Sequence, residues 1–211
     1  MGRSSGSPSP TAFSSRAHMS SYDISRLVRI EFNRSKEIFS TFAHTDALNH
    51  LERRQIALGF LRSASATVAA EEAVLLPTLR EHAEAAMLST ELIERAAERR
   101  AGLKRALEQL DASPRADPRF DAKVERCWIL LSAAFHETDQ RLLPPFDRHA
   151  SPRAREGAGR RFYLFRLLLA PTHPHPRAPS CSTAVGLALN CAMAPFDWAH
   201  DLLRFGPAMP L

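Results

Sequence analysis

Residues 61–79 read LRSASATVAAEEAVLLPTL. This stretch decides the fold because it predicts a helix with a combination of features that is unusual for one helix. Small and apolar residues occupy one face of the predicted helix, and an acidic pair, Glu71 and Glu72, follows them, with Pro77 six positions after Glu71. A carboxylate on a small-residue face is costly unless a cation meets it, because an unpaired buried charge costs on the order of several kcal/mol. The sequence therefore raises the question of which cation meets Glu71.

The whole chain is typical of an all-α protein. Its 211 residues suit one domain of ordinary size with tails. Helix formers dominate the middle of the chain, and no alternating strand pattern recurs between turn signals. We expect a disordered segment at 1–20, rich in Ser, Gly and Pro, and a helical bundle at 21–146. Residues 147–211 should then form a basic linker, a Pro/His-rich segment and an amphipathic segment at 182–204 that docks on the bundle.

Four amphipathic helices with short connections are expected at about 23–42, 46–82, 90–110 and 120–144. Asp23 is a predicted cap or first-turn acid, and Pro77 is expected to bend the second helix. Residues at spacings of three and four form the predicted inner faces. They are Ile24, Val28, Phe32, Ser35, Phe39 and Phe42; Leu51, Leu58, Leu61, Val68, Leu75 and Leu79; Ile93, Ala96, Arg100, Leu103, Leu107 and Leu110; and Trp128, Leu131, Phe135 and Leu142.

The net charge of +5 is concentrated in one stretch after the predicted bundle. Five arginines there stand against the single acid Glu156, and we interpret the stretch as a solvated, loop-like linker because no aromatic residues interleave with the charges as they do on nucleic-acid surfaces. These arginines are Arg148, Arg153, Arg155, Arg160 and Arg161.

The remaining composition favours a soluble cytoplasmic protein. Three cysteines without metal-type spacing indicate a reducing compartment. No signal-peptide pattern begins the chain, and the longest apolar run, 162–171, is too short to cross about 30 Å of hydrocarbon. Histidines at helix ends, His44, His50 and His82, are expected on the surface, and so are His173 and His175 in the extended PTHPHPRAP stretch.

Residues 67–77 resemble the second helix of haemerythrin-like (HHE cation-binding) domains, which carries His, three residues, Glu, Glu and a Leu-aromatic-Pro ending. Thr67 stands in the His place here, and Glu71 and Glu72 are kept. Residues four apart share a helix face, so His and Glu at that interval can reach one ion in a bundle core. The sequence of 23–39, DISRLVRIEFNRSKEIF, is similar to the family's opening helix, with Phe32 at the place of a ligand His.

The resemblance continues through the third and fourth helices and covers about 23–145. AAERRAGLKRAL at 96–107 places Arg100 at a ligand His position, with Lys104 fixing the register. FDAKV at 120–124 resembles the family's entry into its last bundle helix. Two alignments are open there: one keeps His136 with Gln140 as a four-residue step, and one anchored on FDAKV and Pro144 assigns Ala134 and Thr138 to the ligand places. We prefer the second, which leaves His136 and Asp139 as an exposed pair.

This resemblance implies an up-down four-helix bundle whose relatives hold a non-haem di-iron centre, used for oxygen binding, iron handling or oxidative and nitrosative stress responses. The corresponding positions here are Phe32, Thr67, Glu71, Arg100, Ala134 and Thr138. Only Glu71 is a conventional iron ligand, and iron needs several converging N and O donors. We therefore expect a degenerate metal site without a cofactor, in which the guanidinium of Arg100 neutralises Glu71, while Thr67, Ala134 and Thr138 need no charged partner.

Three functional interpretations follow, and we favour a non-enzymatic binding, sensor or scaffold bundle acting on a protein or small ligand. The second is a working metal or oxygen protein that holds non-haem iron through Glu71, Glu72, His136 and Asp139. The third is a nucleic-acid-associated protein that uses the arginines of 148–161. The sequence contains no triad, phosphate loop or zinc spacing that would indicate a hydrolase, kinase or zinc domain.

Overall fold

The computed structural model describes residues 22–114, 116–174, 188, 192–193 and 195–197. All secondary structure in that part of the chain is helical, which confirms the predicted all-α class. None of the helices described there is long and apolar enough to cross a membrane. The predicted disordered segment 1–20, His175 and most of 182–204 lie outside the described residues.

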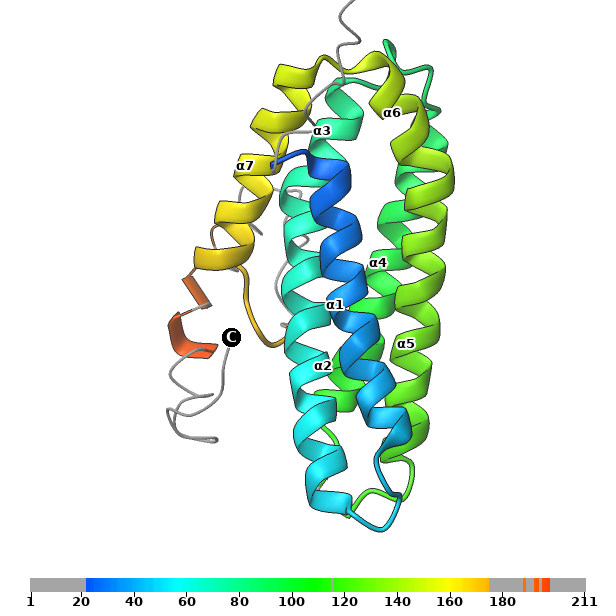
Figure 1. Ribbon diagram of the computed structural model, residues 1–211, viewed down its shortest axis with the longest axis vertical. Coiled ribbons are helices and arrows are strands. Elements are labelled where there is room, and N and C mark those ends of the chain that lie inside the picture. Colours follow the sequence, from blue (N-terminus) through cyan, green and yellow to red (C-terminus); the bar gives the residue numbers. More distant parts are fainter. Residues whose placement is uncertain (1–21, 115, 175–187, 189–191, 194, 198–211) are drawn as a thin grey trace, which may run out of the picture.

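Long helices lie side by side along the molecule (Figure 1). α1 packs on α2, α2 on α4, and α4 on α5. Two of these helices continue, through a wider π-helical turn, into a short final helix. The elements are α1 (Ile24–His44), α2 (His50–Ala70), the π turn η1 (Glu71–Leu75), α3 (Leu76–Glu81), α4 (Thr90–Asp111), α5 (Phe120–Glu137), the π turn η2 (Thr138–Leu142), α6 (Leu143–His149) and α7 (Pro152–Leu168).

The predicted helix starts are confirmed for α1 and α4 and are wrong for α2. Asp23 caps α1 by accepting the backbone N–H groups of Ser25 and Arg26. α2 begins at His50 instead of residue 46, so Leu51 falls in its first turn and is 73% exposed, although it was predicted to be buried. The fourth helix was predicted to end at Pro144, but the helical chain continues through α6 to His149. Pro144 lies in the first turn of α6, where a backbone N–H is not required.

Each π turn ends on the first leucine of a Leu-Leu-Pro sequence, which spans 75–77 in one case and 142–144 in the other. A proline within a helix has no N–H, and its ring clashes with the carbonyl four residues earlier. The turns widen at that place: the N–H of Leu76 donates to the carbonyl of Glu71, and the N–H of Leu143 donates to the carbonyl of Thr138. Each proline thereby places the residue six positions before it at the start of a π turn.

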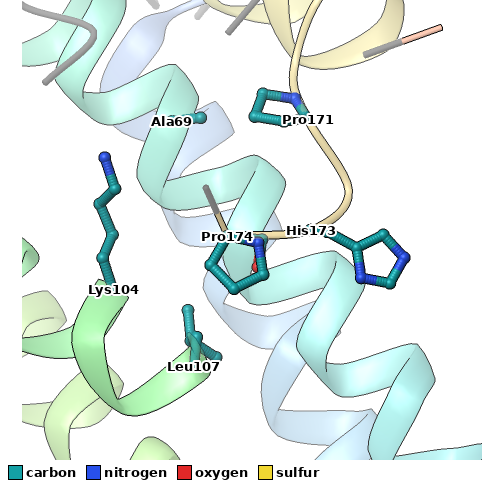
Figure 2. A pocket seen from close by; sticks show the side chains of 7 residues that line it. Ala69, Lys104, Leu107, Pro171, His173 and Pro174 are labelled. Carbon is teal, nitrogen blue, oxygen red and sulfur yellow. The ribbon is translucent and has the colours of Figure 1, made fainter. Parts of the chain in front are cut away.

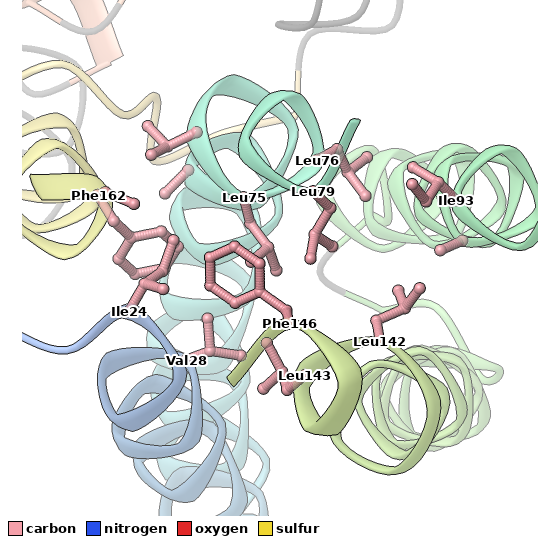
Figure 3. Packing of buried hydrophobic residues seen from close by; sticks show 14 of the residues in the cluster. Ile24, Val28, Leu75, Leu76, Leu79, Ile93, Leu142, Leu143, Phe146 and Phe162 are labelled. Carbon is pink, nitrogen blue, oxygen red and sulfur yellow. The ribbon is translucent and has the colours of Figure 1, made fainter. Parts of the chain in front are cut away.

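The buried side chains form two apolar clusters. One, the proline-end cluster, gathers residues of α1, α3, α6 and α7 around Phe146 and Phe162 (Figure 3). The other, the aromatic cluster, packs Phe42, Phe60 and Leu103 near the opposite end of the long helices. Along α4, Ala96 belongs to the proline-end cluster and Leu103 to the aromatic cluster, so Arg100 lies between the two.

The arginine-rich stretch is a helix, and its prediction as a loop-like linker is wrong. Ser151 caps α7, which buries Ala158, Gly159, Phe162 and Phe165. Two of its arginines bind acids of the first helix: Arg155 lies 3.4 Å from Asp23, and Arg166 lies 3.2 Å from Glu31. The many arginines suggested a loop, although the residues that α7 buries recur at helical spacing. The bundle region therefore shares its core with residues beyond the predicted boundary at 146.

His173 is also placed differently from its predicted exposed position. It is only 6% exposed, and its Nδ1 lies 3.0 Å from Oδ2 of Asp111, while its backbone N–H donates to Asp197. The segment 171–174 bends at Thr172 and His173 instead of running extended as predicted, and it lies against α2 and α4 and not in solvent (Figure 2).

Gly159→Ala should separate α7 from the start of α1. A Cβ at Gly159 would lie 1.6 Å from the carbonyl oxygen of Tyr22, and backbone cannot yield cheaply. We expect the free energy of unfolding, measured with urea, to fall by about 1–3 kcal/mol. Gly157→Ala is the matched control, because nothing lies within 4 Å of a Cβ there, and it should stabilise by about 0.5–1 kcal/mol. Equal effects of the two changes would contradict this packing.

Candidate functional site

Arg100 is the centre of the candidate site. It lies on α4, its side chain is fully buried, and each guanidinium nitrogen donates one hydrogen bond. Nε donates to Oε2 of Glu71 at 2.8 Å, Nη2 to Oγ1 of Thr138 at 2.9 Å, and Nη1 to the carbonyl of Ala96 at 2.9 Å. The predicted pair of Arg100 and Glu71 is therefore confirmed, and one side chain connects α4 to both π turns.

Burial dominates the electrostatics of this pair. Removal from water raises the pKa of Glu71 above its ordinary 4.5, the Arg100 guanidinium lowers it, and the neighbouring carboxylate of Glu72 raises it again. The attraction of a buried pair offsets its desolvation only when the remaining polar atoms are also satisfied. Thr138 and Ala96 supply those contacts for the guanidinium, so the charge of Arg100 is held in the core by three acceptors.

The other three positions assigned to ligands by the resemblance hold residues that fill space or bond within their own helix. Phe32 stacks on Phe135 with ring centroids 3.7 Å apart, and its ring also lies 5.6 Å from that of Trp128. The hydroxyl of Thr67 donates to the carbonyl of Ser63 in the same helix. Ala134 offers its carbonyl to the hydroxyl of Thr138. All six positions are buried.

The two acids proposed as additional ligands, Glu72 and Asp139, each form an ion pair with a different basic side chain. Glu72 pairs with Lys104 at 3.2 Å, and Asp139 pairs with Arg29 of α1 at 2.6 Å. His136 is exposed and Asp139 is partly exposed, so both point at least partly outward as predicted, although the ion pair of Asp139 with Arg29 was not predicted. Within the described ranges, no three His, Cys, Asp or Glu side chains gather where they could hold a metal ion.

Sequence reasoning missed the role of Thr138, which was expected to need no charged partner and instead accepts a hydrogen bond from Arg100. A usable signal was present: Glu71 and Thr138 each stand six residues before the proline of a Leu-Leu-Pro sequence. A second missed feature is Glu137, a buried acid that lies 2.8 Å from Arg99 and follows no motif.

No family model matches this chain, and no curated protein or solved structure matches it either.

Removing one partner of the buried pair should lower the free energy of unfolding more than removing both partners does. Glu71→Ala leaves the buried guanidinium unpaired, and Arg100→Met leaves the buried carboxylate unpaired, so each should destabilise by about 3–5 kcal/mol. The double variant Glu71→Leu with Arg100→Met removes both charges and should recover about half of the loss or more. Chemical unfolding at neutral pH measures all three values.

The matched control is Glu94→Ala. This residue pairs with Arg80 at 2.9 Å on the surface, where the glutamate side chain is 53% exposed. Its loss should cost about 0–1 kcal/mol, because an exposed pair gains little over hydration. A cost below about 0.5 kcal/mol for Glu71→Ala would show that the Arg100 pair contributes little to folding.

Proposed function

We propose that this protein is an up-down four-helix bundle of the haemerythrin-like type whose metal site has been replaced by Arg100, and that it acts as a non-enzymatic binding or scaffold protein. The observation that carries the proposal is the fully buried guanidinium of Arg100 on Glu71 and Thr138. In the family pattern, those three positions would supply ligands to iron.

The residues present do not fit a di-iron centre. Phe32 and Ala134 have no side-chain donor atom, and the hydroxyl of Thr67 is bonded to its own helix. The one conventional ligand, Glu71, already carries a fixed cation at 2.8 Å, which would repel a metal ion. Iron requires several convergent N and O donors, and this set supplies one carboxylate.

The helical arrangement supports the bundle topology in this proposal. α1 and α2 run in opposite directions (Figure 1). The connections at 45–49, 82–89 and 112–119 are short, and short connections join antiparallel neighbours in bundles. α7 is an addition to that topology, packed against α1 and α2.

Partner binding at the surface is favoured over a small ligand in the core. A cavity beside the site, lined by Ser65, Ala69 and Lys104 and closed by the segment from Pro171 to Pro174, has a volume of about 10 Å³ (Figure 2). Such a space holds roughly one water molecule. Arg100, Phe32 and Phe135 fill the region that ligands would occupy in the family pattern.

Elemental analysis of protein produced in iron-supplemented medium tests this function. We expect less than about 0.1 iron or manganese per chain and no oxo-bridge absorption band, because one carboxylate paired with arginine binds metal weakly. Anaerobic addition of Fe(II) to the purified chain should also leave no stoichiometric iron after desalting. Stoichiometric metal with an oxo-bridge band would overturn the proposal in favour of a working metal protein.

A further inference from the structure

The outward face of α7 combines positive charge with exposed leucines. The inner face is the buried stripe described above, and the opposite side chains recur at spacings of three and four. Along the helix, this outward face is basic in its first half and apolar in its second. Its residues are Arg153, Gly157, Arg160, Arg161, Leu164, Leu167 and Leu168.

The apolar half is strongly exposed. Leu164, Leu167 and Leu168 expose 52, 57 and 66% of their surface, and Leu169 beyond them exposes 43%. Single exposed leucines need no explanation, but consecutive turns of them on one helix face are typical of an interaction surface. The leucines follow directly on the arginines, so a partner that covers the whole face must accept both.

The basic half keeps its charge on the surface. Arg153 and Arg161 are exposed, although Arg161 also lines a pocket together with Glu81 of α3, and Arg160 pairs at 2.6 Å with Glu156 one turn before it. Arg155 and Arg166 instead turn inward to acids of the N-terminal helix region. The outward face itself contains no acid, so it carries a net positive charge.

These charges discriminate between possible occupants. A second copy would place arginines against arginines if the two α7 helices ran parallel, or against leucines if they ran antiparallel. A nucleic acid would use the arginines and leave the leucines in water. A bilayer with anionic lipids uses both, because arginines contact headgroups while leucines enter the headgroup and acyl boundary.

We propose that the outward face of α7 docks on the surface of a membrane that contains anionic phospholipids. α7 lies at the edge of the molecule (Figure 1), and its outward leucines are exposed. The docking is peripheral, with the helix on the bilayer and not across it. It does not depend on the metal-free character of the core.

Vesicle cosedimentation with the full chain tests this docking. We expect binding to phosphatidylcholine vesicles that contain phosphatidylserine, weaker binding at high salt, and little binding to phosphatidylcholine alone. Replacing Leu164, Leu167 and Leu168 by Gln should weaken binding by about tenfold or more, and Arg153→Glu with Arg161→Glu should do the same. The matched control replaces Leu48 and Leu51, which are 82 and 73% exposed at the start of α2, by Gln and should bind like the wild type.

Several results would overturn the docking proposal. One is wild-type protein that stays in the supernatant with both kinds of vesicle. Another is equal binding by the wild type and the leucine variant, which would show that the leucines are not in the contact. A third is that the wild type binds duplex DNA more tightly than vesicles, and that this binding is lost in the arginine variant but kept in the leucine variant. That result would assign the face to nucleic acid. A dimer in sedimentation velocity that the leucine variant abolishes, without vesicle binding, would assign it to a second copy.

Discussion

The buried ion pair between Arg100 and Glu71 constrains the rest of the structure. Both charges are out of water, so the fold must supply acceptors for every guanidinium nitrogen and must keep the carboxylate within reach of its partner. Those requirements fix three chain segments relative to one another: the middle of α4 and the first residues of the two π turns. They also place a polar layer between the two apolar clusters.

The side chains around this pair are mutually consistent. A planar guanidinium with several donors needs several acceptors, and Glu71, Thr138 and the carbonyl of Ala96 provide them. The aromatic ring of Phe32 fills volume against Phe135 instead of presenting a polar atom. This combination holds the cation of Arg100 in the core between the helices.

Much of this could be predicted from sequence because the relevant signals were local. The seam of α4 and the acid at Glu71 followed from helical spacing and the cost of an unpaired charge. The π turns were not predicted, because a proline alone indicates a bend; the six-residue spacing that Glu71 and Thr138 share before their prolines was the available signal. α7 was not predicted as a helix because arginines dominate its composition. The stripe of Ala158, Gly159, Phe162 and Phe165 can be recognised as a buried face only when its contact with α1 is known. The burial of His173 depends on Asp111, a contact between residues 62 apart in sequence that no local pattern encodes.

The most direct test of the buried cation is the NMR signal of the Arg100 Nε–H group in the wild-type chain. We expect a resolved signal that persists in D₂O after the signal of Arg95, whose ion pair with Glu91 lies on the surface, has exchanged. The signal should show a hydrogen bond to the Glu71 carboxylate and should disappear or move in Glu71→Ala. An Arg100 Nε–H that exchanges as fast as that of Arg95, or that is unaffected by the loss of Glu71, would contradict it.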